Sequence, residues 1–199
     1  MKNSTDPACV GLLLAAGSGR RFDASGAQDK LLQPLADGRS VATAAAANML
    51  AALPRVVAVV RPGAGALASE LAQAGCEVVV CAQAAEGMGH SLACALQHTA
   101  DAGGWVVALA DMPHVAPHTI AALAQAVADG AEIAAPSYHG VRGNPVAFAP
   151  VHLPYLLRLN GDQGARNLLQ QFFVTEVAVD DAGIRQDIDT SADLLRLSA

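Results

Sequence analysis

The regular alternation of short apolar runs with alanine-rich stretches restricts the fold of this chain more than any other feature. Most of the apolar runs are continuous, which is the pattern of strands that are covered on both faces. The predicted strands are residues 9–14, 56–60, 77–81, 105–110, 132–136, 145–148 and 175–179. The predicted helices are residues 40–52, 65–74, 90–99, 117–129, 162–172 and 191–197. This order predicts an α/β fold, with a mostly parallel sheet wrapped by helices.

One stretch departs from the alternation and predicts a small antiparallel hairpin. Residues 138–148 place the turn-rich segment 139–143 between two strand-like runs. Helix ends are also marked in the sequence, because Ser40 stands at an N-cap position and Gly75 and Gly130 stand at C-cap positions. No repeat or linker divides the 199 residues, and this length fits a single domain.

Charge and cysteine content exclude several classes of protein. The net charge of −6 and the absence of a basic stripe argue against a nucleic-acid partner. Cys9, Cys76, Cys81 and Cys94 form no C-x-x-C pair, so we expect reduced thiols in a cytoplasmic protein. The apolar run 10–16 is too short for a signal sequence or a membrane span, so no membrane association is expected.

A glycine-containing loop follows the first predicted strand. It reads Leu14-Ala15-Ala16-Gly17-Ser18-Gly19-Arg20-Arg21-Phe22, and Lys30 lies a short way beyond it. In parallel α/β sheets the loop after the first strand is a favoured ligand site. Glycine lets backbone N–H groups approach phosphate oxygens closely, and Arg20 and Lys30 add positive charge. The combination suits a triphosphate.

Two common phosphate-binding motifs fit this loop poorly. The dinucleotide fingerprint G-x-G-x-x-G is half met, because Phe22 stands at the third glycine position. The P-loop string G-K-[ST] occurs nowhere in the chain. From the residues alone, an ordinary glycine turn flanked by surface arginines remains an open alternative.

Carboxylates at two places suit a metal ion. Asp111 directly follows the buried-strand pattern 105–110, where it would face the ligand edge of the sheet and offer hard oxygen ligands to Mg²⁺. A turn cap before Pro113 is the alternative role for Asp111. Asp187 and Asp189 share a face if their segment is extended. Capping of the final helix by Asp189 or Thr190 is the competing interpretation there.

The string L-A-A-G-x-G-x-R, followed by a lysine, resembles the signature loop of the MobA-like NTP transferases. Within them it looks most like the molybdenum cofactor cytidylyltransferases (MocA-like proteins). Further segments resemble the same family in the same order: G-M-x-x-S-L within residues 83–92, L-A-D-M-P at 109–113, R-G-N-P at 142–145, G-D-x-G-A-R at 161–166 and D-I-D-T at 187–190. Residues 22–29 depart from the family pattern, because this segment is longer than usual.

This resemblance implies a fold and a set of site residues. The implied fold is one nucleotidyltransferase domain over residues 1–199, a three-layer α/β/α, Rossmann-like sheet of the nucleotide-diphospho-sugar transferase type. The implied catalytic residues are Arg20, Lys30 and Asp111. The implied nucleotide-binding residues are Leu14, Ala15, Ala16, Gly17, Gly19, Arg20, Lys30, Gln83, Gly87 and Met88. Asp111 and Asp189 are the implied Mg²⁺ ligands, and Asn144, Asp162 and Arg166 the implied acceptor-binding residues.

The resemblance also implies a reaction. Guanylyl-transferring relatives usually have glycine where this chain has Ala16, so the cytidylyl branch is favoured. The expected activity is transfer of CMP from CTP to the molybdenum cofactor on molybdopterin, with release of pyrophosphate, and a target molybdoenzyme is a candidate protein partner. The alternatives are a guanylyl- or uridylyltransferase for another phosphorylated acceptor, a non-catalytic nucleotide or cofactor carrier, and a redox dinucleotide-binding protein.

Overall fold

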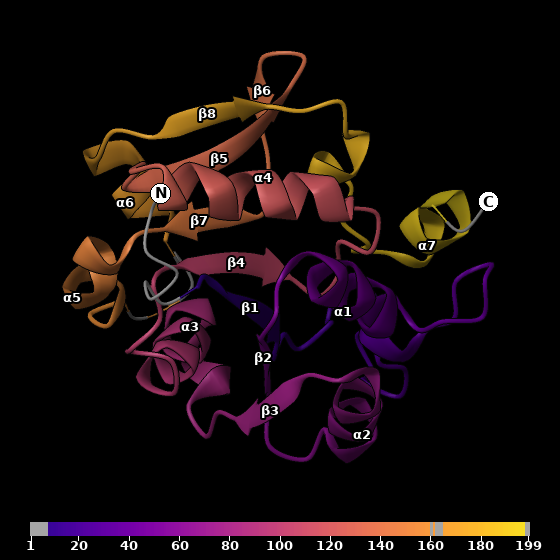
Figure 1. The fold of residues 1–199 in the computed structure, drawn as a ribbon. Coiled ribbons are helices and arrows are strands. Elements are labelled where there is room, and N and C mark those ends of the chain that lie inside the picture. Colours follow the sequence, from indigo (N-terminus) through magenta and orange to yellow (C-terminus); the bar gives the residue numbers. More distant parts are fainter. Residues whose placement is uncertain (1–7, 160, 162–164, 198–199) are drawn as a thin grey trace.

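Eight strands form one mixed sheet in the computed structural model, which describes residues 8–159, 161 and 165–197 (Figure 1). The strands are β1 (Val10–Ala15), β2 (Val56–Val60), β3 (Glu77–Val80), β4 (Trp105–Leu109), β5 (Ile133–Tyr138), β6 (Val141–Arg142), β7 (Val146–Phe148) and β8 (Thr175–Ala178). Their order is β3-β2-β1-β4-β7-β5-β6, with β8 on β5. Strands β1 to β4 are parallel, and β7 runs antiparallel to both β4 and β5.

Helices cover both faces of this sheet. They are α1 (Val41–Ala52), α2 (Gly65–Ala74), α3 (Met88–Gln97), α4 (Pro117–Ala128), α5 (Leu153–Leu156), α6 (Arg166–Gln171) and α7 (Ser191–Leu197). Leu13 and Ala15 of β1 belong to one core with α1, α2 and α4. Leu12 and Leu14 of the same strand belong to a second core with α3, α5 and α6. Alternate side chains therefore serve opposite faces, and the predicted three-layer α/β/α fold is confirmed.

The predicted caps and the hairpin are also present. The Ser40 hydroxyl accepts a hydrogen bond from the Thr43 N–H at the start of α1. Gly75 ends α2 with a left-handed φ of 108°, which a residue without a Cβ adopts easily. Strands β5 and β6 pair antiparallel through Ser137–Arg142 and Tyr138–Val141, as the turn-rich segment predicted.

Several element boundaries differ from the predicted ones. The third helix begins at Met88 instead of residue 90, because Gly87 supplies the break with a φ of 128°. The described part of the helix predicted over 162–172 is Arg166–Gln171. The short α5 was not predicted, since four residues are too few to show helical periodicity. All four cysteines are free thiols, and no described helix is long and apolar enough to cross a membrane.

Candidate active site

The carboxyl ends of β1 and β4 bring the glycine loop and Asp111 together. Leu14 of β1 is paired with Leu109 of β4, and the Ala110 N–H donates to the Leu14 carbonyl at 3.1 Å. The glycine loop that follows β1 and the segment with Asp111 that follows β4 therefore begin side by side. This is the edge at which open α/β sheets bind ligands.

Lys30 reaches the same edge from a short 3₁₀ turn, Lys30–Leu32. Its side chain is nearly buried, and its Nζ lies 2.6 Å from Asp111 Oδ2 and 3.1 Å from Asp189 Oδ1. Burial alone would lower the pKa of Lys30, but the charges and hydrogen bonds of the two aspartates together raise it. Lys30 is therefore a firmly charged ammonium between two carboxylates.

The C-terminal segment is held so that Asp189 faces Lys30. Asp181, which is buried, accepts hydrogen bonds from the Ala116 N–H, the Thr119 hydroxyl and the Gly183 N–H. Further along, the Ile188 N–H donates to the Asp111 carbonyl at 2.9 Å. The segment after β8 is thus attached to the start of α4 and then to the Asp111 loop.

The final helix is capped by Thr190 and not by Asp189. Thr190 Oγ1 accepts from the Asp193 N–H, and Asp193 Oδ2 accepts from the Thr190 N–H, which is a reciprocal capping arrangement for α7. Asp189 is left to bind Lys30 and, through its second oxygen, Arg21.

The carboxylates at this edge fit a divalent cation. Asp111 Oδ1 is buried and has no hydrogen-bond partner among the described residues. Burial, and after it the neighbouring charges of Asp189 and Asp111, raise the pKa of Asp187, so a third carboxyl group feels the charge of the other two. No described group of three such side chains is already arranged as a complete metal site. A hard cation that keeps water and phosphate ligands needs only one or two carboxylates.

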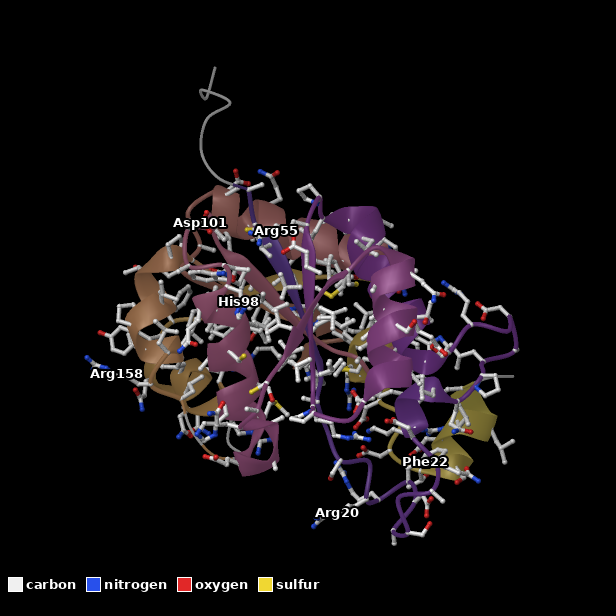
Figure 2. The ribbon with its side chains drawn as sticks, turned by 90° about the horizontal axis from the view of Figure 1, so that it is seen from below. Arg20, Phe22, Arg55, His98, Asp101 and Arg158 are labelled. Carbon is white, nitrogen blue, oxygen red and sulfur yellow. The ribbon has the colours of Figure 1, made fainter. Side chains whose placement is uncertain are left out.

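A cavity of about 750 Å³ opens over these groups. The predicted residues that line it are Leu14, Ala16, Gly17, Gly19, Arg20, Lys30, Gly87, Met88, Asp111 and Asp189. Ala15 does not line it, because its side chain is fully buried in the core. Gln83, at the start of the turn Ala84–Glu86, is not among the lining residues either. Arg20 is exposed on the outer rim of the loop (Figure 2).

Two arginines of this cavity were missed by the sequence reasoning. Arg21, not Arg20, contacts Asp189, and the sequence offers nothing to rank one of two adjacent arginines above the other. Arg61 follows the buried run of β2 immediately, at the same edge as Asp111. The rule that singled out Asp111, a charged residue just after a buried strand, would have found Arg61 too.

A second cavity of about 800 Å³ adjoins the first and shares Leu14, Met88 and Leu109 with it. The predicted acceptor residues Asn144 and Arg166 line it. Asp162, the third of them, lies outside the described residues. The cavity floor is apolar, with Leu92, Val107 and Phe148 among its residues, and Arg142 stands on its rim. The two cavities give a bipartite site, with Asp111 and Lys30 in the first.

Gly17 offers a direct test of this loop. Its φ is not left-handed, and an added Cβ would meet nothing within 4 Å, so Gly17→Ala should leave the stability of the ligand-free protein unchanged. The new methyl group would project beside the cavity and keep phosphate oxygens from the backbone. We expect KM for the nucleotide to rise about tenfold, the cost of a lost hydrogen bond to an anion. Steady-state kinetics and urea denaturation check this, with Gly65→Ala, equally unhindered but outside the cavity, as the control. Unchanged KM would contradict phosphate binding by the loop.

A three-layer α/β/α fold in which a glycine loop, a lysine and two aspartates meet at one cleft is the architecture of a nucleotidyltransferase. Residues 11–177 match the MobA-like NTP transferase domain, and the chain belongs to this family. It is 30% identical over 197 residues to the purine catabolism protein PucB of Bacillus subtilis (strain 168), covering 92% of this chain and 93% of that protein.

Solved structures share this fold over nearly the whole chain. The crystal structure of Rv0371c from Mycobacterium tuberculosis H37Rv is 30% identical, with a TM-score of 0.82, and the match covers 96% of this chain and 98% of that one. The structure of Rv0371c in complex with manganese is 29% identical, with a TM-score of 0.78, covering 96% and 97% of the two chains.

Proposed function

We propose that this protein transfers CMP from CTP to the molybdenum cofactor on molybdopterin and releases pyrophosphate, with Mg²⁺ as its metal. The observation that carries the proposal is the cluster of Lys30, Asp111 and Asp189 at the floor of the first cavity, next to the second. Each cavity takes one substrate, and the shared wall is where their reacting groups meet.

The chain's own residues supply most of the chemistry in this proposal. The acceptor is a phosphate monoester, already ionised, so its oxygen attacks the α-phosphorus in line without a strong base. The difficulty is to bring two anions together. Backbone N–H groups at Gly17 and Gly19 receive the triphosphate, while Arg20, Arg21 and Lys30 offset its charge and that of the leaving pyrophosphate.

Asp111 and Asp189 would hold the metal. Asp111 Oδ1, which is buried and has no hydrogen-bond partner among the described residues, supports this assignment. When bound, a divalent cation of this kind stabilises the negative charge that develops on the phosphate oxygens. The complex of the related mycobacterial protein with manganese supports a divalent metal here as well.

Lys30 must then change partners. In the ligand-free protein its ammonium group binds both Asp111 and Asp189, the same carboxylates that would hold the metal. With those carboxylates engaged in holding a metal, Lys30 would be free to bind the phosphates of a nucleotide in the cavity that it lines. Lys30 thereby keeps a negative partner before and after substrate binds.

The assignment of the second cavity to the acceptor rests on its polarity. Its apolar floor suits a flat heterocycle, and Arg142, Arg166 and Asn144 at its rim suit a phosphate and polar ring atoms. The choice of cytosine over guanine rests on Ala16 in the glycine loop, where the guanylyl-transferring relatives usually have glycine. A target molybdoenzyme that accepts the product, and a cytoplasmic location, belong to the same proposal.

Pyrophosphate release from CTP, GTP, ATP and UTP, each with and without molybdopterin-bound molybdenum, tests the proposal. We expect release from CTP that depends on both the cofactor and the divalent cation, and at least about tenfold less from the other nucleotides. Release from GTP but not from CTP would overturn the cytidylyl assignment and leave the assignment as a nucleotidyltransferase standing. Nucleotide binding without any release would favour a carrier.

A further inference from the structure

The glycine loop is closed at its base by one side chain that no family motif assigns. Arg61 stands directly after β2, whose Val60 is paired with Ala15 of β1. The Arg61 Nη1 group donates to the Gly17 carbonyl at 2.5 Å, and its Nη2 group donates to Asp29 Oδ2 at 2.9 Å. Gly17 and Asp29 are the residues on either side of the loop 18–28. One planar guanidinium, with its several N–H donors, therefore joins both ends.

Asp29 connects Arg61 to the turn that carries Lys30. Its other oxygen, Oδ1, accepts from the Leu31 N–H at 3.0 Å and so caps the 3₁₀ turn that carries Lys30. The Asp29 carbonyl accepts from Gln33 Nε2 at 2.9 Å, which ties the same turn at its far end. Arg61 holds Asp29, Asp29 begins the turn, and the turn aims Lys30 at Asp111.

The loop 18–28 is ordered by hydrogen bonds between its own residues. The Phe22 and Asp23 N–H groups donate to the Gly19 carbonyl. Asp23 Oδ1 accepts from the Ser25 N–H at 2.9 Å, and Asp23 Oδ2 accepts from the Gln28 N–H at 2.8 Å. The hydrogen bond from the Ser25 hydroxyl, at 2.6 Å, and then these two backbone hydrogen bonds lower the pKa of Asp23, so the carboxylate stays ionised and keeps accepting them. The loop is thus a small ordered unit, and its place relative to the sheet depends on how its base is held.

We propose that Arg61 is a positioning residue: it clamps both ends of the loop 18–28 and thereby sets Lys30 against Asp111. The side chain of Arg61 is about one-third exposed, at 34%, so the ion pair adds little to global stability. Its effect is local, because it joins two segments that the loop would otherwise let move apart. The consequence for catalysis rests on the proposed function, but the clamp itself does not.

Limited trypsin digestion without nucleotide tests the clamp directly. The loop contains two tryptic bonds, after Arg20 and Arg21, and an internal loop must open before trypsin can cut it. We expect Arg61→Met to raise the cleavage rate at these two bonds by about tenfold or more. Arg55→Met is the matched control. It removes an arginine from the other end of β2, where Arg55 holds Glu77 at 2.8 and 2.9 Å, far from Arg20 and Phe22 (Figure 2).

A second variant tests the partner. Asp29→Asn keeps an oxygen for the Leu31 N–H but loses the ion pair with Arg61, so it should speed cleavage in the same way. The double variant Arg61→Met/Asp29→Asn should be cut no faster than Arg61→Met alone, because both changes break one link. Fully additive rates would overturn the link between these residues.

Kinetics then test the consequence for Lys30. Arg61→Met should lower kcat by about tenfold with a smaller change in KM, and Arg61→Lys should recover part of it, since an ammonium reaches fewer acceptors than a guanidinium. Cleavage of Arg61→Met at the wild-type rate would overturn the clamp. Faster cleavage with unchanged kcat would overturn its assigned effect on Lys30. If the wild type transfers no nucleotide, the proposed function fails, and the digestion still decides the clamp.

Discussion

Asp111→Ala should abolish metal-dependent nucleotide transfer while leaving a folded protein. The change removes Asp111 Oδ1, the buried oxygen that has no hydrogen-bond partner within the described part of the chain, and Asp111 Oδ2, which binds Lys30. We expect turnover to fall by at least about 10³-fold, or about 4 kcal/mol of transition-state stabilisation. Binding of Mn²⁺ should weaken by about 100-fold, which titration calorimetry measures without any turnover.

The fold should survive this change because Lys30 keeps its second partner, Asp189. Circular dichroism and a cooperative thermal transition are the measurements of choice. Asp101→Ala is the matched control, since Asp101 is exposed and precedes β4, whereas Asp111 follows that strand. Figure 2 shows Asp101 far from Arg20 of the glycine loop. Near-normal turnover by Asp111→Ala would show that this carboxylate holds no metal, and an equal loss in the Asp101 variant would trace the effect to general damage.

Lys30→Met should lower activity nearly as much as Asp111→Ala, but it should not weaken metal binding. The ammonium group is removed from between Asp111 and Asp189, so the nucleotide loses a preorganised cation. We expect kcat/KM to fall by about 10²–10³-fold, as for other preorganised donors. The carboxylates left behind repel one another, so the metal-free variant should melt at a lower temperature than the wild type.

The metal dependence of Lys30→Met separates this account from simple unfolding. With its competing ammonium gone, the carboxylate cluster should bind Mn²⁺ at least as tightly as in the wild type, and added Mn²⁺ should recover most of the lost stability. Thermal melts with and without Mn²⁺ give the answer. Arg39→Met, which breaks an exposed ion pair with Asp37, is the control. Weaker Mn²⁺ binding by Lys30→Met would contradict the exchange of partners proposed for Lys30.

Much of the fold could be predicted from the sequence. Short, valine-rich apolar runs such as Val56–Val60 are typical of strands covered on both faces, and the cap residues Ser40 and Gly75 mark where helices begin and end. Short elements could not be predicted in the same way. The four residues of α5 carry no periodic signal, and they are helical because of the tertiary contacts that Leu156 makes in the core.

The residues of the site likewise divide into those that the sequence could predict and those that it could not. Asp111 and the glycine loop were predictable, because a residue that directly follows a buried parallel strand must emerge at the ligand edge of the sheet. The contact of Arg21 with Asp189 and the choice of Thr190 over Asp189 as the helix cap were not, because each depends on which residue a side chain meets in the folded protein. The place of Arg61 at the ligand edge follows from the same rule as that of Asp111, but its contacts with Gly17 and Asp29 do not. Asp189 lies beside Lys30 only because Asp181 and Ile188 attach the C-terminal segment to α4 and to the Asp111 loop.

By itself, the sequence determined the strands, the layers and the loop that opens toward the ligand, since these follow from hydrophobic periodicity and from glycine and capping residues within a few positions of one another. Only the tertiary structure decided that Lys30 sits between two carboxylates and that Arg61 closes the loop. Both are contacts between residues far apart in the chain, and their geometry exists only after β1, β2, β4 and the C-terminal segment have packed together.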